Sequence, residues 1–203
     1  MEENKTELLE PLFFRLNSLQ PLSTIVIDEL TRNFKIKQIP KGEILLHEGN
    51  VCNKLWFLIK GVLRYYHFIT ENEITSRIVF DTHIVISPGS FFGQTASTET
   101  IEALQPSIIA ELTYEGLQSI YKKFPEFNFH GRKITEQYFI NSEQRLYLLR
   151  KHNAADKYLY FLENFPGIIN KIPHKYIASF LGISPETLSR VRHSLSEKNN
   201  KPD

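Results

Sequence analysis

The residues best suited to recognise another molecule lie near the C-terminus, between Ile172 and Leu195. Within this stretch Glu186, Ser189 and Arg190 are three and four positions apart, so a helix would place them on one face. An arginine guanidinium can pair with the acceptor atoms of guanine, and a glutamate carboxylate can accept from the amino group of cytosine. This spacing predicts a helix that reads base edges in the major groove of DNA.

Two short helices joined at Gly182 are predicted to present that face. Gly182 can adopt the left-handed conformation that ends a helix, and Ser184 and Pro185 supply a capping hydroxyl and a proline suited to the first helical turn. The residues expected to face the core are Tyr176, Ile177, Phe180 and Leu181 on the first helix and Leu188, Val191 and Leu195 on the second. The segment has the form of a helix-turn-helix, although the same arrangement is also a common packing device with a solvated polar face.

The distribution of charge favours DNA locally rather than globally. The formal net charge is only +1, but residues 170–203 contain six Lys and Arg against three Asp and Glu. Arg192 lies on the shoulder of the second helix, where a phosphate is a better target than a base. The predicted DNA-binding residues are Ser184, Pro185, Glu186, Thr187, Ser189, Arg190, Arg192, His193, His174 and Lys175.

Most of the preceding chain is expected to be β-structure that carries these helices. From Phe34 to Leu112, runs rich in Val, Ile, Tyr and Phe are separated by turn residues such as Gly42, Gly49 and Gly61. Such a series predicts an antiparallel barrel or jelly roll. The expected strands cover 34–39, 43–46, 54–59, 62–69, 74–80, 84–86 and 107–112, after helices over 6–19 and 23–34.

A long helix over about 127–151 is predicted next, after a shorter one over 114–124. The residues expected on its dimerisation stripe are Ile134, Tyr138, Leu146 and Leu149, with Phe139, Tyr147 and Leu148 widening the apolar surface. The helix could pack only on its own barrel, but its length favours a second covered face, and therefore a homodimer. A hinge is expected over 152–156, followed by an amphipathic helix that ends before Pro166.

The N-terminus and composition predict a soluble, cytoplasmic protein with no membrane partner. Residues 2–5 are charged or polar and no long apolar run follows them. A hydrophobic fraction of 41%, with 15 Phe and 9 Tyr, is enough for a substantial core. The single cysteine, Cys52, excludes an internal disulfide and leaves too few thiolates for a cysteine-ligated iron–sulfur cluster.

The barrel, long helix and C-terminal helix pair together resemble the Crp/Fnr (catabolite activator and fumarate-nitrate regulator) family over essentially the whole chain. Ile177–Arg190 is similar to the family's recognition segment, and Gly42, Gly49 and Phe57–Gly61 match the glycine-marked turns of its cyclic-nucleotide-type barrel. The resemblance implies an α+β fold with a jelly-roll sensor domain (1–126), a dimerisation helix (127–151) and a winged-helix-like helix-turn-helix domain (152–203).

By the same resemblance, the protein would be a dimeric, effector-responsive transcription regulator in which Glu186 and Arg190 read bases. Its target would be a palindromic operator with half-sites roughly 34 Å apart. RNA polymerase would be a further partner, and an unidentified small molecule would be the effector.

One departure from the family concerns the effector. Its nucleotide-binding members carry a phosphate cassette with a Gly-Glu pair and a later Arg, whereas residues 90–100 here contain no Arg or Lys. Burying a phosphate without a cation is costly, so no cofactor is predicted and cyclic nucleotide is not expected. The hydroxyls of Thr95, Ser97, Thr98 and Thr100 could bind another effector or simply form a polar loop. The residues expected to line an effector pocket are Phe92, Gly93, Gln94, Ser97, Thr98, Tyr138 and Ser142.

A second departure concerns the wing. The family commonly follows the recognition helix with a β-hairpin, for which 196–203 is too short and too polar, so most of the wing is expected to be missing. Lys198 and Lys201 on a flexible tail would then replace some of its phosphate contacts.

Two other classes of protein share parts of this pattern. A metal-dependent jelly-roll enzyme needs clustered ligands, but the seven His are scattered, with no His-x-His or His-x-x-x-His pair, so neither a metal nor an enzymatic activity is predicted. A ligand-sensing dimer whose C-terminal helices bind a protein instead of DNA would keep the barrel and the dimer. The sequence leaves that alternative open.

Overall fold

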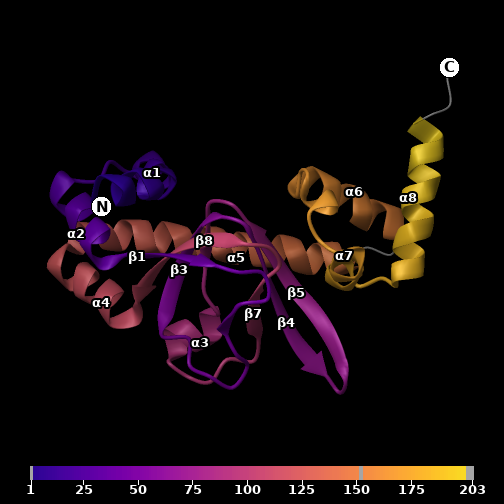
Figure 1. The fold of residues 1–203 in the computed structure, drawn as a ribbon, viewed down its shortest axis with the longest axis horizontal. Coiled ribbons are helices and arrows are strands. Elements are labelled where there is room, and N and C mark those ends of the chain that lie inside the picture. The colour runs from indigo at the N-terminus through magenta and orange to yellow at the C-terminus, as the bar shows by residue number, and fades with distance from the viewer. Residues whose placement is uncertain (1, 151–152, 200–203) are drawn as a thin grey trace. The chain divides into compact units, whose positions relative to one another are not determined.

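The computed structural model describes residues 2–150 and 153–199, which divide into two compact units (Figure 1). The first contains the residues up to His67 together with Ile78–Gln137. The second contains Phe68–Arg77 and the residues from Tyr138 onward. Each unit buries its own apolar residues.

The first unit is built on two four-stranded antiparallel sheets, which confirms the predicted α+β jelly roll. One sheet has the order β1 (Lys35–Ile39), β8 (Ser107–Thr113), β3 (Lys54–Lys60) and β6 (His83–Val85). The other has the order β2 (Ile44–Leu46), β7 (Thr100–Ala103), β4 (Val62–Ile69) and β5 (Asn72–Phe80). In the first sheet Trp56 of β3 pairs with Glu111 of β8 on one side and Val85 of β6 on the other.

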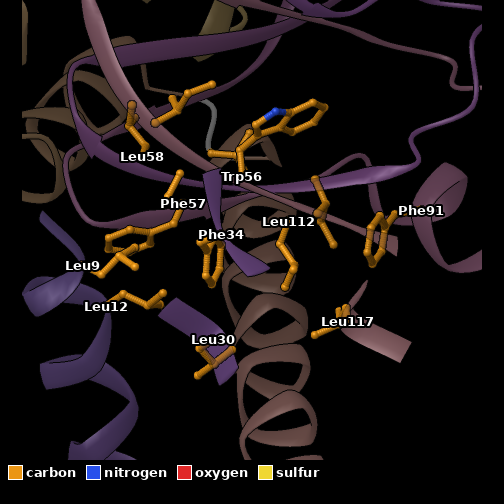
Figure 2. Packing of buried hydrophobic residues seen from close by; sticks show 14 of the residues in the cluster. Leu9, Leu12, Leu30, Phe34, Trp56, Phe57, Leu58, Phe91, Leu112 and Leu117 are labelled. Carbon is orange, nitrogen blue, oxygen red and sulfur yellow. The ribbon is translucent and has the colours of Figure 1, made fainter. Parts of the chain in front are cut away.

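Alternation along the strands fills the core of this unit. Leu63 and Tyr65 of β4 and Ile101 and Ala103 of β7 are fully buried and share one face of the sheet, and Val62 and Arg64 of β4 are buried as well. Helices α1 (Glu2–Leu19), α2 (Thr24–Asn33) and α4 (Tyr114–Lys123) lie beside the strands of this unit (Figure 1), and each contributes apolar residues to the core. Figure 2 shows Leu9 of α1 beside Phe57 of β3, so the N-terminal helices close the core.

The predicted elements agree with the structure, with a few differences. The seven predicted strands are present within two residues at each end, and Ser23 caps α2 by accepting from Val26 N–H at 3.4 Å. Strand β7 and helix α3 (Pro88–Gly93) were not predicted. β7 has only four residues, with Glu102 in the middle, and α3 begins at the Pro88-Gly89 pair, which is more typical of a turn.

Helix α5 (Asn128–Arg150) begins in the first unit, after the short 3₁₀ turn Pro125–Phe127, and ends in the second. Ile134, near its start, packs against the core of the first unit. The predicted hinge begins at His152, which lies outside the described residues, as does the last residue of the predicted long helix. Asn153 caps the next helix by accepting from Ala155 N–H at 2.8 Å.

The second unit contains α6 (Ala154–Asn164), the 3₁₀ turn Ile168–Asn170, α7 (His174–Leu181) and α8 (Pro185–Asn199). An aromatic cluster joins α6 to α7: the ring of Phe165 stacks on Phe161 at 4.8 Å and meets Phe180 edge-on at 5.3 Å. Ile177 and Leu181 of α7 and Leu188 of α8 are buried in the same unit as this cluster. Their burial confirms the predicted helix-turn-helix. Helix α8 continues to Asn199, so the start of the predicted flexible tail, including Lys198, is helical. Residues 196–199 contain no Gly or Pro that would end the helix earlier.

Candidate nucleic-acid interface

The turn between α7 and α8 has the predicted geometry. Gly182 adopts a left-handed conformation with φ of 62°, and Ile183 N–H donates to the carbonyl of Ala178 at 3.1 Å. The Ser184 hydroxyl accepts from Thr187 N–H at 3.1 Å, so Ser184 caps a helix that begins at Pro185. These bonds fix the direction in which α8 leaves α7.

The polar face of α8 points away from the core. Glu186, Ser189 and Arg190 are exposed, whereas Leu188 is 1% exposed. The Arg190 guanidinium donates to the Thr187 hydroxyl at 3.2 Å, and that hydroxyl lies 3.1 Å from the Ser184 hydroxyl. The side chains that would meet a base are therefore partly ordered beforehand, which lowers the entropic cost of binding.

Glu186 is held in its charged form. Its own backbone N–H donates to the carboxylate, the Ser184 hydroxyl donates as well, and the charge of Arg190 is nearby, so the pKa of Glu186 lies below its ordinary value. An ionised carboxylate only accepts hydrogen bonds, which matches the amino group of cytosine.

The basic residues outside this face form a second group. Arg192 Nη1 lies 2.8 Å from Nδ1 and 2.9 Å from Nε2 of His174, and Lys175 lies over the ring of Tyr176 at 4.9 Å. Because an arginine N–H only donates, the imidazole of His174 is the acceptor in this contact. A groove beside this group is lined by Tyr158, Leu162, Ser189, Arg192, His193, Leu195 and Ser196. All ten predicted DNA-binding residues thus lie on α7, on α8 or in the turn between them.

The outer surface of α5 carries a row of exposed apolar side chains. Phe139 and Leu146 are 65% and 49% exposed, and Ile140 and Tyr147 are 48% and 70% exposed. Each pair is seven residues apart, the repeat of helices that pack side by side. Among the residues predicted for dimerisation, Leu146 and Leu149 are exposed, whereas Ile134 packs on the barrel core and Tyr138 is half-buried.

The prediction of this row was incomplete because the face of α5 covered by the rest of the chain was unknown. Leu148, predicted to widen the apolar surface, is buried. Ile140 was missed, although its spacing of seven from Tyr147 was a usable signal.

The hydroxyls predicted for the effector pocket bond largely to the protein itself. Ser97 is buried; its hydroxyl accepts from Glu99 N–H at 3.1 Å and donates to the Glu99 carbonyl at 2.8 Å. Thr100 Oγ1 accepts from Glu48 N–H at 3.0 Å, and Ser90 Oγ accepts from Cys52 N–H at 2.8 Å. These bonds hold the segment 90–100 against the loop between β2 and β3. We call the three hydroxyls of Ser90, Ser97 and Thr100 the hydroxyl latch.

The other predicted pocket residues are distributed over both units. Phe92, Gly93, Gln94 and Thr98 are exposed in the first unit, and Gln94 donates to the Phe91 carbonyl at 2.6 Å. Tyr138 and Ser142 belong to the second unit, where the Ser142 hydroxyl donates to the Tyr138 carbonyl at 3.0 Å.

Little else among residues 2–150 and 153–199 suggests a metal site, a reactive thiol or a membrane-spanning helix. Across residues 2–150 and 153–199, no group of three or more His, Cys, Asp or Glu side chains is arranged to hold a metal ion. Cys52 is buried, and this burial raises the pKa of its thiol. None of the helices within those ranges combines the length and the apolar character needed to cross a bilayer.

Comparison with known proteins relates both units to regulators. Residues 36–124 match the cyclic nucleotide-binding domain family. Over 171 residues the chain is 25% identical to the fumarate and nitrate reduction regulatory protein of Vibrio cholerae, covering 76% of this chain and 66% of that protein. Over 182 residues it is 21% identical to the cyclic AMP receptor protein of Thermus thermophilus, covering 85% of this chain and 82% of the other. It spans only 60% of an anaerobic regulatory protein of Pasteurella multocida, at 22% identity.

Solved structures show the same fold. The catabolite activator protein of Thermus thermophilus has a TM-score of 0.55 at 19% identity, covering 94% of this chain and 88% of that one. FixK2 from Bradyrhizobium japonicum has a TM-score of 0.71 at 14% identity, covering 82% and 86%.

The hydroxyl latch predicts a stability effect confined to its buried members. Ser97→Ala should lower the free energy of unfolding by about 1–3 kcal/mol, because it removes a buried hydroxyl and leaves the half-buried Glu99 N–H without its acceptor. Urea denaturation measures this change. Thr98→Ala is the matched control: Thr98 is adjacent and exposed, so its loss should cost less than about 0.5 kcal/mol. Equal effects of the two changes would contradict the latch.

Proposed function

Because this chain belongs to the Crp/Fnr family of regulators, we propose that it is a transcription regulator that binds a palindromic operator as a homodimer. The observation that carries the proposal is the exposed face of Glu186, Ser189 and Arg190 on α8, held outward by the turn at Gly182. It acts in the cytoplasm, where DNA and RNA polymerase are available as partners. The names of its relatives, which are those of regulators and not of enzymes, support this assignment.

The chemistry of the face favours DNA over a protein partner. Protein interfaces concentrate aromatic and aliphatic anchors in a buried centre. The outward face of α8 offers a carboxylate, a hydroxyl and a guanidinium, with Arg192, His174 and Lys175 beside it. Charged and polar groups of this kind suit base edges flanked by phosphates.

The proposed dimer contact lies on α5. Four exposed apolar side chains in two pairs seven residues apart, Phe139 with Leu146 and Ile140 with Tyr147, form a seam that a second copy of the same helix can cover. A two-fold pair of α5 helices would supply two reading faces, and palindromic half-sites roughly 34 Å apart accept two such faces.

The jelly roll is the effector-responsive part, and its effector is not a cyclic nucleotide bound through a cassette arginine. Residues 87–100 contain no Lys or Arg, and the buried hydroxyls of that segment bond to the protein itself. A buried phosphate there would have no fixed cation.

The function is tested by selecting binding sites from a random duplex pool with the purified protein. Recovery of a palindrome whose half-sites are centred about one helical turn apart is the expected result. Absence of any salt-sensitive DNA binding at low ionic strength would reject the proposal in favour of the protein-partner alternative.

Two arginine substitutions separate reading from phosphate contact. Arg190→Ala should cost about 1–3 kcal/mol and relax the selected sequence at one position of each half-site. We call the helices α6, α7 and α8 of one protomer its head. Arg192→Ala should weaken binding to every sequence and reduce the slope of log affinity against log salt by about one unit per head. Quantitative gel-shift titrations at three salt concentrations measure both. If the two variants act alike on all sequences, the assigned roles are wrong.

The seam on α5 can be broken without disturbing the barrel. Leu146→Arg should weaken dimerisation roughly a hundredfold or more, because each copy loses a buried leucine and gains a charge at the seam. Sedimentation velocity measures the monomer–dimer equilibrium. Gln144→Arg adds the same side chain at an exposed polar position of the same helix and should leave the dimer intact. A dimer that tolerates Leu146→Arg as well as Gln144→Arg would place the seam elsewhere.

Cyclic AMP should not act as the effector. A ligand at a hundred times its Kd stabilises the folded state by about 2.7 kcal/mol, which a thermal melt detects easily. Millimolar cyclic AMP is expected to shift the melting midpoint no more than AMP does. A rise specific to cyclic AMP would overturn this expectation.

A further inference from the structure

We propose that the tip of the hairpin between β4 and β5, residues 68–77, positions the DNA-reading helices, and that Ser179 on α7 is the positioning residue through which it does so. This inference rests on the proposed function. It concerns the second unit, to which both the hairpin tip and α7 belong.

The central contact is a shielded hydrogen bond. Thr75 N–H, on β5, donates to the Ser179 hydroxyl at 2.8 Å across 104 residues of sequence. Thr75 is 1% exposed, so water competes poorly for this bond. On α7 the neighbours of Ser179, Ala178 and Phe180, are buried in the head, whereas Ser179 is only half-buried. The Ser179 hydroxyl therefore points away from the packed core of α6, α7 and α8 and contacts β5 instead.

The same strand also contacts α5. Arg77, two residues after Thr75 and thus on the same face of β5, donates to the Tyr138 hydroxyl and lies 4.9 Å from the centre of its ring. The strand β5 thereby links α5 to α7 directly, whereas along the chain α7 is reached from α5 only after α6.

Helix α5 adds contacts to the same part of the head. The Arg145 guanidinium lies 4.3 Å from the ring centre of Phe180, and a Leu149 methyl would lie 3.7 Å from a side chain added at Gly182. Because the turn at Gly182 fixes α8 to α7, any contact that holds α7 against α5 also holds the reading face.

The consequence is specific to binding two half-sites at once. In a dimer joined through α5, the orientation of α8 relative to α5 sets the separation of the two reading faces. A single head on one half-site needs no such separation. The Thr75–Ser179 bond should therefore contribute to affinity for the full palindrome and not for an isolated half-site.

The test uses the full chain and two duplexes built from the selected operator, one with both half-sites and one with a single half-site. Ser179→Ala should reduce affinity for the full site roughly tenfold, by loss of one hydrogen bond per head, and for the half-site less than twofold. Ser179→Thr keeps the hydroxyl and should restore full-site affinity. Ser18→Ala, a helical serine in the first unit whose hydroxyl bonds the Arg15 carbonyl, is the control and should change neither.

Amide hydrogen exchange reads the contact without DNA. The Thr75 amide should exchange slowly in the wild type and faster in Ser179→Ala, with Ser179→Thr close to the wild type. An unchanged Thr75 amide, an equal loss of affinity on both duplexes, or tighter full-site binding by Ser179→Ala would each overturn the proposal. Failure of the wild type to bind any duplex would reject the proposed function instead, whatever the exchange of Thr75 shows.

Discussion

The turn at Gly182 is the constraint on which the reading surface depends. A left-handed residue, followed by a hydroxyl that caps the next helix, leaves one direction for α8 to follow. Once that direction is set, burial of Leu188 places Glu186 and Arg190 on the opposite, exposed side of α8. The polar face is therefore a product of apolar burial.

The jelly roll has hydroxyl groups in the segment where the nucleotide-binding members of the Crp/Fnr family are expected to have a charged arginine. Ser90 and Thr100 accept from backbone N–H groups of the loop between β2 and β3 and tie the segment 90–100 to it, whereas the Ser97 hydroxyl bonds within the segment, to Glu99. Neutral bonds of this kind hold a loop without the desolvation cost of a buried ion. The segment can thus keep its shape with no bound anion.

The sequence predicted the elements whose signals are local. Glycine at 182, serine at 184 and the apolar spacing of α8 each act within a few residues. The first two predictions are confirmed, and of the three predicted core residues of α8 Leu188 is buried whereas Val191 and Leu195 are half-buried. Strand β7 was missed because its pairing with β4 depends on Arg64 meeting Glu102, 38 residues apart in sequence. Ser179 was missed for the same reason: nothing near it in sequence indicates that its partner is Thr75.

Helix α5 shows why its row of exposed apolar residues was only half predictable. Ile134 packs on the barrel core, and the Tyr138 hydroxyl accepts a hydrogen bond from Arg77. Phe139 and Leu146 are exposed. Periodicity identifies apolar residues but not which neighbour covers them, so residues serving three different contacts appeared as one stripe. With the covered sides assigned, the outward row keeps a strict spacing of seven, and that regularity is what argues for an identical helix as its partner.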